Sequence, residues 1–326
     1  MAKFKLYKLR FSALHLGDER ADYDKSNLVY HSDSMYAAIT SALAKVGTVI
    51  PDNGDFGFSI SSLFPFYQRD KESKTVYFLP RILKQDAFEP ELRKKVKKIA
   101  WLDLPSYTKY IHGEPLFEGR VNESSMKGNY FTSKIIDEDF ISSNVNPRVV
   151  ISRDGSEDAK PFYMERLFFK EGSGLYFMAT GETQVIDRAL EILQDEGIGT
   201  DRTIGNGFFE CETDMMEMIL PKSETISNLS MFIPETKEQL KVLFETESLA
   251  YHFQKRGGWI TDAGLNTYRK NNIYMFDEGG VFNYIEKIDT EIVLGKVVNL
   301  KPTIEHVPIK HPIYRDGRAL FIPVVK

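Results

Sequence analysis

The chain has 326 residues, a net charge of −5 and 13% aromatic residues. This length exceeds the roughly 100 to 200 residues of a single domain, so the sequence predicts two domains. The acidic balance argues against a uniformly basic nucleic-acid binder and restricts any such role to a local surface. The single cysteine, Cys211, excludes an intrachain disulfide and a zinc site built from several cysteines. The six histidines include no HExxH pair, so we expect neither a metal nor another cofactor.

The amino-terminal residues MAKFKLYKLRF alternate charged and apolar side chains and lack the apolar segment of a signal peptide. No apolar run approaches the ~20 residues needed to cross a bilayer. We therefore expect a cytoplasmic protein with no membrane partner.

The amino-terminal half shows both strand and helix periodicities. The patterns predict a strand over 3–11, a helix capped by Ser32 or Asp33 and ended by Gly47, extended pieces over 60–66 and 76–83, and a basic amphipathic helix over 91–99. From about 112 to 160, Gly, Asn, Ser and Asp predominate, which favours long loops or an excursion from the core. We interpret the region from about 85 to 160 as an insertion.

Regular patterns return after Pro161. They predict strands over 162–170, 174–180 and 208–213, a helix over 183–195, a strand over 226–234, a helix opened by a Thr236–Gln239 capping box, and strands over 249–254, 272–276, 281–284, 292–298 and 320–324. The order β-α-β-β, insertion, β-β-α-β followed by a second start near 221–225 favours an α+β protein. Two split β-α-β units, over 1–215 and 216–326, are the simplest architecture.

A glycine-rich segment, GIGTDRTIGNG, occupies residues 197–207 between a predicted helix and a predicted strand. This order is the reverse of the Rossmann motif, and no GK[ST] sequence completes a P-loop. One interpretation is a loop whose missing side chains let a phosphodiester backbone approach, with main-chain N–H groups and Arg202 donating to phosphate oxygens. A plain left-handed turn is the alternative.

A second candidate site is the helix start His31-Ser32-Asp33-Ser34, together with His15 and Gly17 upstream. The N-terminus of a helix can hold a phosphate, but Ser32 and Asp33 are also ordinary capping residues. His15 and His31 could alternatively be the general acid and base of a ribonuclease.

Several motifs occur together in one order: LHLG, HSDSMYAAI, SSLFPF with YFLPR, NPRVVISRDG, GTDRTIGNGFF, RGGWI with DEGGVF, and HPIYRDGRALFIPV. In this order they resemble the fourth subunit of the type III-A CRISPR Csm effector complex, a member of the RAMP superfamily. The resemblance covers nearly the whole chain. It departs from the pattern at Asp201 and Asn206, which make the glycine loop less basic, and at Gly280, where serine is frequent.

The resemblance implies two ferredoxin-like (RRM-type) domains and a non-catalytic subunit of an antiviral interference complex. Such a subunit holds the repeat-derived 5′ handle of the CRISPR RNA. It bridges the large palm-domain subunit, a cyclic-oligoadenylate synthase, to the backbone RAMP subunit, and meets target RNA only indirectly. Two rivals stay open: a RAMP endoribonuclease that processes repeat RNA, and an adaptor that binds only proteins.

Carried over by motif, the predicted RNA contacts fall in five segments: 15–17, 31–34, 148–153, 197–207 and 256–259. Arg148 and Arg153 lie in an excursion that resembles the thumb-like hairpin of the family. The full set of predicted RNA-binding residues is His15, Gly17, His31, Ser32, Asp33, Ser34, Arg148, Arg153, Gly197, Gly199, Thr200, Arg202, Thr203, Gly205, Asn206, Gly207, Arg256, Gly257 and Trp259. Backbone subunits of such complexes cut RNA with an aspartate in a comparable early loop, but in this chain we expect Asp33 to cap the helix and position RNA.

Overall fold

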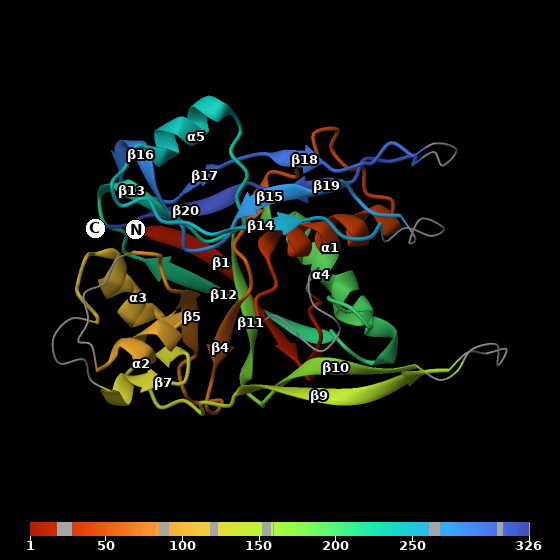
Figure 1. Ribbon diagram of the computed structural model, residues 1–326, viewed down its shortest axis with the longest axis horizontal. Coiled ribbons are helices and arrows are strands. Elements are labelled where there is room, and N and C mark those ends of the chain that lie inside the picture. The colour runs from red at the N-terminus through yellow and green to blue at the C-terminus, as the bar shows by residue number, and fades with distance from the viewer. Residues whose placement is uncertain are drawn as a thin grey trace.

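The computed structural model describes residues 1–17, 28–84, 91–117, 123–151, 158, 160–260, 268–304 and 309–325. It is a mixed α+β protein (Figure 1). The amino-terminal strands are β1 (Ala2–Phe11), β2 (Ala13–Leu14), β3 (Phe58–Ile60), β4 (Phe64–Tyr67), β5 (Val76–Pro80), β6 (Trp101–Asp103), β7 (Met126–Lys127), β8 (Tyr130–Phe131), β9 (Ile141–Val150), β10 (Lys160–Phe169), β11 (Ser173–Gly181) and β12 (Phe209–Met218). The helices of this part are α1 (Ser32–Lys45), α2 (Arg93–Lys98), α3 (Leu104–Ile111) and α4 (Thr183–Glu196), with 3₁₀ turns η1 (Glu123–Ser125) and η2 (Arg202–Ile204).

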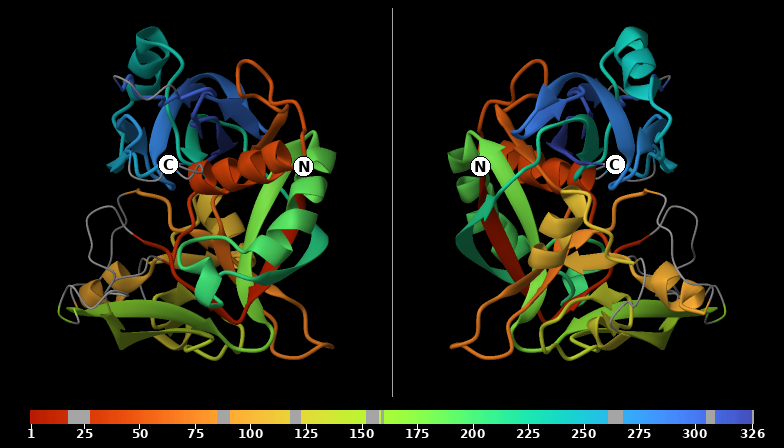
Figure 2. Two further views of the ribbon diagram at one scale, coloured as in Figure 1. Left: turned by 90° about the vertical axis from the view of Figure 1, so that its right-hand side faces the viewer. Right: turned by 90° about the vertical axis from the view of Figure 1, so that its left-hand side faces the viewer.

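The carboxy-terminal part begins after β12. Its elements are β13 (Ser223–Asn228), α5 (Lys237–Phe244), β14 (Phe253–Arg256), β15 (Ile273–Phe276), β16 (Val281–Ile288), β17 (Ile292–Leu294), β18 (Val297–Asn299), β19 (Tyr314–Asp316) and β20 (Ala319–Pro323). One sheet has the strand order β16-β13-β20-β17, and β14–β15 and β18–β19 form separate two-stranded ribbons. Figure 2 shows α5 on the opposite side of the molecule from the β9–β10 hairpin. In the described part of the chain, no helix is long and apolar enough to cross a membrane.

The main amino-terminal sheet has the order β12-β1-β11-β4-β5-β6-β8-β7, and β3 also pairs with β11. Both faces of β1 are buried: Tyr7 and Leu9 pack with α1 and α4, whereas Phe4 and Leu6 pack with the inserted elements and with the carboxy-terminal sheet. This two-sided burial explains why the alternation of apolar residues in β1 loses its phase near Tyr7.

The two parts share one apolar core. Leu229, Leu320 and Ile322 of the carboxy-terminal part are fully buried in the same cluster as Phe4 and Met178. Because this packing is continuous, the two parts are held rigidly against each other. The division at 215/216 stays a prediction.

Several expected elements are confirmed, with shifted ends. The helices α1, α2, α4 and α5 and the strands β1, β10, β11, β12, β15, β16 and β20 lie where the periodicity placed them. The Thr236 hydroxyl accepts a hydrogen bond from the Gln239 N–H at 3.1 Å, as a capping residue should. Gly47 has φ +78°, which suits the residue that follows a helix end.

Other expectations were wrong. The predicted strand over 60–66 is divided into β3 and β4, because Ser61 and Ser62 direct their N–H groups to Met178 and Leu229. Similarly, the piece predicted over 292–298 is two strands, β17 and β18, separated by Gly295 with φ +107°. The first carboxy-terminal strand, predicted over 226–234, is β13 and ends at Asn228, and the strand expected over 249–254 begins only at Phe253.

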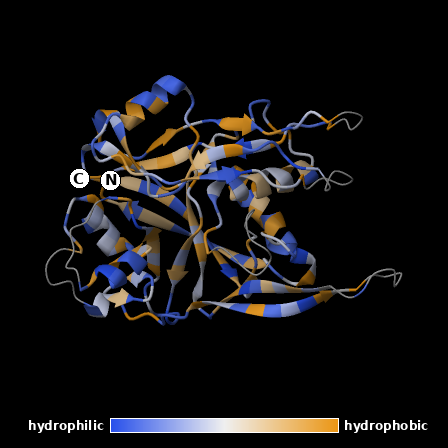
Figure 3. Ribbon diagram, in the orientation of Figure 1, coloured by the Kyte–Doolittle hydropathy of each residue, from blue (hydrophilic) through white to orange (hydrophobic). Residues whose placement is uncertain are grey.

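For residues 112–160 we expected long loops or an excursion from the core; the loop alternative is wrong for residues 141–150, which lie in a hairpin. Residues 141–150 form β9, which pairs along its whole length with β10, from Ile141 opposite Phe169 to Val150 opposite Lys160. The resulting hairpin extends well beyond the rest of the fold (Figure 1). Hydrophilic and hydrophobic segments alternate along it (Figure 3); Met164 and Leu167 of β10 are buried, whereas most of β9 is exposed.

Candidate nucleic-acid interface

The start of α1 is fastened by side chains from the carboxy-terminal part. The N-cap residue is His31, so the prediction that Ser32 or Asp33 would cap the helix was wrong. The Ser32 hydroxyl accepts a hydrogen bond from the Met231 N–H at 2.9 Å, and the Ser32 N–H donates to the Ser62 hydroxyl at 2.8 Å. These side chains connect the two parts of the chain and are not turned toward solvent.

Asp33 forms a buried ion pair with two arginines. Its carboxylate has no exposed surface and accepts from Arg256 Nε at 2.9 Å, from Arg256 Nη2 at 2.9 Å and from Arg315 Nη1 at 2.5 Å. Burial alone would raise the pKa of the Asp33 carboxyl, but the two guanidinium groups outweigh it and hold the pKa well below its usual value. Asp33 is therefore a buried anion that joins α1 to β14 and β19.

His31 is held in the same junction by Glu278. Its Nδ1 lies 2.9 Å from Glu278 Oε1, its Nε2 lies 3.1 Å from Gln254 Nε2, and Glu278 also accepts from the Ser62 hydroxyl. Burial alone would lower the pKa of His31, but the charge of Glu278 outweighs it and raises the pKa. Burial alone would raise the pKa of Glu278, and the His31 cation reverses that shift, so the pKa of Glu278 is lowered.

This pair predicts a pH dependence of stability. Because the pKa of His31 is raised in the folded state, its stabilisation is fully present below the unfolded value of about 6.5 and is lost as pH rises through the folded pKa. We expect the free energy of unfolding, measured by urea titration, to fall in the wild type as the pH rises above about 6.5. The His31→Gln variant should lack that decrease, and an equal decrease in both proteins would assign it to other groups.

The glycine segment is bonded to its own chain. The Ile198 N–H donates to the Gly207 carbonyl at 2.9 Å, the Gly207 N–H to Ala13 at 2.8 Å and the Thr200 N–H to His15 at 3.1 Å. A Cβ at Gly207 would lie 1.9 Å from the Ile198 oxygen, and one at Gly199 would lie 2.6 Å from the His15 oxygen. At these two positions the missing side chain is required by packing within the protein, which corrects our interpretation that it makes room for a ligand.

The tip of the segment is different. Arg202, Thr203, Ile204 and Gly205 are exposed, and a Cβ at Gly205 would meet nothing within 4 Å. Arg202 donates to the Gly197 carbonyl at 3.3 Å and lies 4.0 Å from Glu196, with 42% of its side chain exposed. Asp201 adopts the left-handed conformation with φ 53° and sets the direction of the turn. A rigid base thus presents an exposed, weakly basic turn over residues 202–205.

The base of this turn contacts His15, the β9–β10 hairpin and the start of α1. His15 is fully buried and its Nδ1 lies 2.6 Å from the Glu165 carbonyl oxygen. Arg166 of β10 donates to Asn206 Oδ1 at 2.7 Å. Burial, with the charge of Asp33, raises the pKa of Tyr30 to about 12, and a hydrogen bond from the Gly199 backbone opposes that shift. Thus the glycine segment, the hairpin and the helix start form one connected unit.

The remaining predicted residues lie on the two ribbons. Arg148 is half-buried on β9, among exposed apolar side chains such as Val145, Val149 and Tyr163. Arg153 lies outside the described residues. Gly257 accepts from Arg315 Nη2 at 2.6 Å, and Trp259 is 51% exposed beneath the Arg269 guanidinium, whose Cζ lies 4.6 Å from the ring centroid.

The structure brings most of the predicted residues together, through partners that sequence reasoning missed. Tyr30, Arg166 and Arg315 connect the predicted segments. Of these three residues, only Arg315 could have been found from the sequence, because it lies in the HPIYRDGRALFIPV motif. Gly17 belongs to the unit through its neighbour Thr200, whose methyl group would lie 3.8 Å from a Cβ at Gly17.

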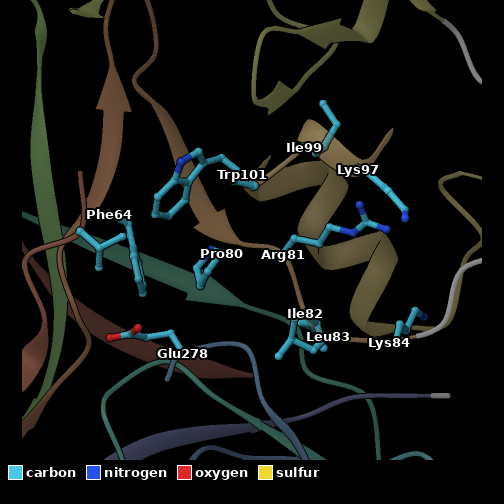
Figure 4. Close-up of a pocket in the computed structure, with 12 residues that line it drawn as sticks. Phe64, Pro80, Arg81, Ile82, Leu83, Lys84, Lys97, Ile99, Trp101 and Glu278 are labelled. Atoms are coloured by element: carbon cyan, nitrogen blue, oxygen red, sulfur yellow. The ribbon is translucent and has the colours of Figure 1, made fainter. Parts of the chain in front are cut away.

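A separate pocket of about 430 Å³ lies between the insertion and the carboxy-terminal part (Figure 4). Two of its cations are engaged by the protein: Arg81 donates to the Val96 carbonyl at 2.7 Å and lies over Phe117, and Lys84 lies over the ring of Tyr110. None of the predicted RNA-binding residues lines it. The pocket therefore gives no support to the nucleic-acid interface.

Comparison with known proteins supports the resemblance. Residues 221–324 match the family model described as the CRISPR Csm4 C-terminal domain. A protein named CRISPR system Cms protein Csm4 from Thermococcus onnurineus is 27% identical over 253 residues, covering 70% of this chain and 74% of that protein. Its namesake from Streptococcus thermophilus is 22% identical over 332 residues, covering 98% of each chain.

Solved structures share the fold. A chain in the crystal structure of the Csm3–Csm4 subcomplex of the type III-A CRISPR-Cas interference complex aligns with a TM-score of 0.63 at 18% identity, over 99% of this chain and 100% of that one. A chain of the Csm1–Csm4 cassette in complex with cA4 aligns with a TM-score of 0.58 at 20% identity, over 99% and 98%. The matches therefore indicate a protein of the CRISPR Csm class. Within that class, residues 221–324 match the Csm4 C-terminal domain, and the chain is similar to Csm4 proteins over nearly its whole length.

Proposed function

We propose that this chain is the non-catalytic, RNA-binding subunit of a type III-A interference complex. It holds the repeat-derived 5′ handle of the CRISPR RNA and bridges a Csm1-type large subunit to a Csm3-type backbone subunit. The similarity to Csm4 proteins supports this role, because the aligned solved chains come from a Csm1–Csm4 cassette and a Csm3–Csm4 subcomplex. The soluble partners of such an assembly fit a cytoplasmic protein.

The topology supports the finer fold assignment. The strands β12, β1, β11 and β4 lie in the order 4-1-3-2 of a ferredoxin-like domain, with α1 and α4 packed together on one face. In the carboxy-terminal part, β13 is a central strand between β16 and β20 and is followed by α5, but the order β16-β13-β20-β17 departs from 4-1-3-2. We infer an RRM-type unit in the amino-terminal part and a second, rearranged unit that has only α5 as a helix among the described residues.

The observation that carries the RNA assignment is the exposed turn at residues 202–205 on a rigid, internally bonded base. A backbone phosphate can approach Gly205 without steric hindrance and can accept from Arg202 and Thr203. The projecting β9–β10 hairpin is tied to that base through Arg166 and Asn206 and can insert between nucleotides. A turn fixed in this way can hold an RNA strand in one orientation.

The buried histidines weaken the rival ribonuclease. His15 has no exposed surface, and His31 is paired with Glu278 inside the junction between the two parts. A general base must reach the proton that it abstracts, within hydrogen-bond distance or through one water. Incubating the purified chain with repeat RNA in chelator decides between the two functions, since specific cleavage that is lost in His31→Ala would overturn our proposal.

The turn is tested by the double variant Arg202→Ala/Thr203→Ala. We expect weaker binding of a 5′-handle RNA, measured by fluorescence anisotropy, and a salt slope reduced by about 0.7 for each phosphate that the variant no longer neutralises. Arg188→Ala is the matched control, because it removes the same charge from an exposed position on α4. Equal affinities and slopes in the double variant and the wild type would contradict the assignment.

A further inference from the structure

The β14–β15 ribbon carries an exposed aromatic face. Phe253 pairs with Phe276, Lys255 with Tyr274 and Arg256 with Ile273, and the Lys270 N–H extends the pairing to the Gly258 carbonyl at 2.9 Å. Phe253 is 57% exposed, Tyr274 63% and Trp259 51%. The rings of Phe253 and Tyr274 meet edge to face, with centroids 5.7 Å apart. Large aromatic side chains that remain this exposed contribute little to the core.

The other face of the same ribbon packs against the rest of the protein. Gln254 contacts His31, Arg256 pairs with Asp33 and Met275 is buried. These contacts hold the ribbon against the start of α1 (Figure 1) and leave Phe253, Lys255 and Tyr274 on the outer side. The ribbon is therefore rigid on one side and available on the other.

The charge of the ribbon is opposite to that of the chain. Residues 252–260 and 268–276 contain Lys255, Arg256, Arg269 and Lys270 and no aspartate or glutamate, in a protein of net charge −5. Arg256 is neutralised by Asp33, while Lys255 and Arg269 are exposed beside the aromatic rings. Aromatic rings interleaved with cations, without carboxylates, are typical of surfaces that bind single-stranded nucleic acid.

We propose that the outer face of this ribbon is a second RNA contact, on which Phe253, Tyr274 and Trp259 stack unpaired bases while Lys255 and Arg269 attract the phosphates. This inference rests on the proposed function and specifies that the same single-stranded RNA is read by base stacking at a site distinct from the glycine turn. A protein partner that bound here by apolar burial would depend on the apolar area of these side chains. It would not depend on the flat faces of their rings, so aliphatic side chains could replace them.

Tryptophan fluorescence gives a direct test. The sequence has two tryptophans: Trp101 is buried at 4% exposure and Trp259 is half exposed, so quenching on RNA addition reports mainly Trp259. We expect a single-stranded 5′-handle RNA to quench the emission of the full chain. An abasic RNA of equal length and charge should bind at least about tenfold more weakly and leave the emission unchanged, because it has phosphates but no bases to stack.

A leucine series separates stacking from apolar docking. The double variant Phe253→Leu/Tyr274→Leu keeps apolar area but removes both rings, and we expect it to bind the handle RNA about tenfold or more weakly than the wild type. Tyr274→Phe retains the ring and should bind as the wild type does. Ile285→Ala, which removes an exposed apolar side chain from β16, is the control for surface truncation.

The outcomes distinguish this inference from the proposed function. If the leucine double variant binds as tightly as the wild type and bound RNA leaves Trp259 unquenched, while Arg202→Ala/Thr203→Ala still weakens binding, the ribbon contact is wrong and the turn stands. If the wild type binds neither the intact nor the abasic handle RNA, the proposed function and the ribbon contact are both overturned. If the wild type binds intact and abasic RNA equally, phosphate contacts alone explain the affinity and the stacking assignment fails.

Discussion

Replacing Asp33 by asparagine is expected to lower the free energy of unfolding by about 3–5 kcal/mol, because it leaves buried guanidinium charge without a counter-ion. Asp33 has no exposed surface, and the Arg315 side chain that faces it is only 7% exposed. The substitution keeps the shape of the side chain and removes only its charge. Equilibrium urea unfolding of the full chain measures the loss.

Two variants define the scale of that effect. Glu217→Gln breaks the Lys3–Glu217 pair, whose side chains are 60% and 51% exposed, and should cost less than about 1 kcal/mol. Arg256→Met leaves Arg315 to neutralise Asp33, so we expect a loss smaller than that of Asp33→Asn. A change below about 1 kcal/mol in Asp33→Asn would show that the buried pair does not hold the two parts of the chain together.

An element of this fold can be predicted from the sequence when its own residues show which face is buried, and it is missed when its position depends on distant segments. The helices α1 and α4 were predicted because each presents one apolar stripe to one sheet. The hairpin strand β9 was missed because its stability comes from pairing with β10, and residues such as Asn144, Asn146 and Pro147 carry no strand signal. The separation of β17 and β18 depends on Gly295, whose Cβ would lie 2.2 Å from the Gly317 oxygen, a contact that no local pattern shows.

The same reasoning applies to the candidate site. The motifs located the glycine turn, the helix start and the 256–259 segment, and the structure joins them around Asp33 and Tyr30. What the sequence could not show is the direction of each side chain. Asp33 and Arg315 are 282 residues apart in the chain, and only the packing of the two parts reveals that the supposed capping residue is one end of a buried ion pair. The aromatic face of β14–β15 was missed for a similar reason, since alternation alone does not show which face is covered.

The second large effect is expected at Gly207. Changing it to alanine should destabilise the protein by roughly 2–5 kcal/mol, because the residue has φ +80° and the new Cβ would lie 1.9 Å from the Ile198 oxygen. The backbone must move to relieve this contact, which breaks the Ile198–Gly207 and Gly207–Ala13 hydrogen bonds that fix the base of the turn. We therefore expect Gly207→Ala to lose both stability, measured by urea unfolding, and binding of the 5′-handle RNA.

Gly205→Ala is the matched variant that separates the two losses. Gly205 has φ +90°, so alanine there still costs about 1 kcal/mol, but nothing lies within 4 Å of the added methyl group and the base of the turn stays intact. If RNA approaches the bare backbone at the tip, this methyl group obstructs the phosphate, and affinity should fall by more than the change in stability explains. A Gly205→Ala protein that binds the handle RNA as tightly as the wild type would mean that the glycines of this segment serve only its internal packing. The RNA would then have to be held by the hairpin and the β14–β15 ribbon instead.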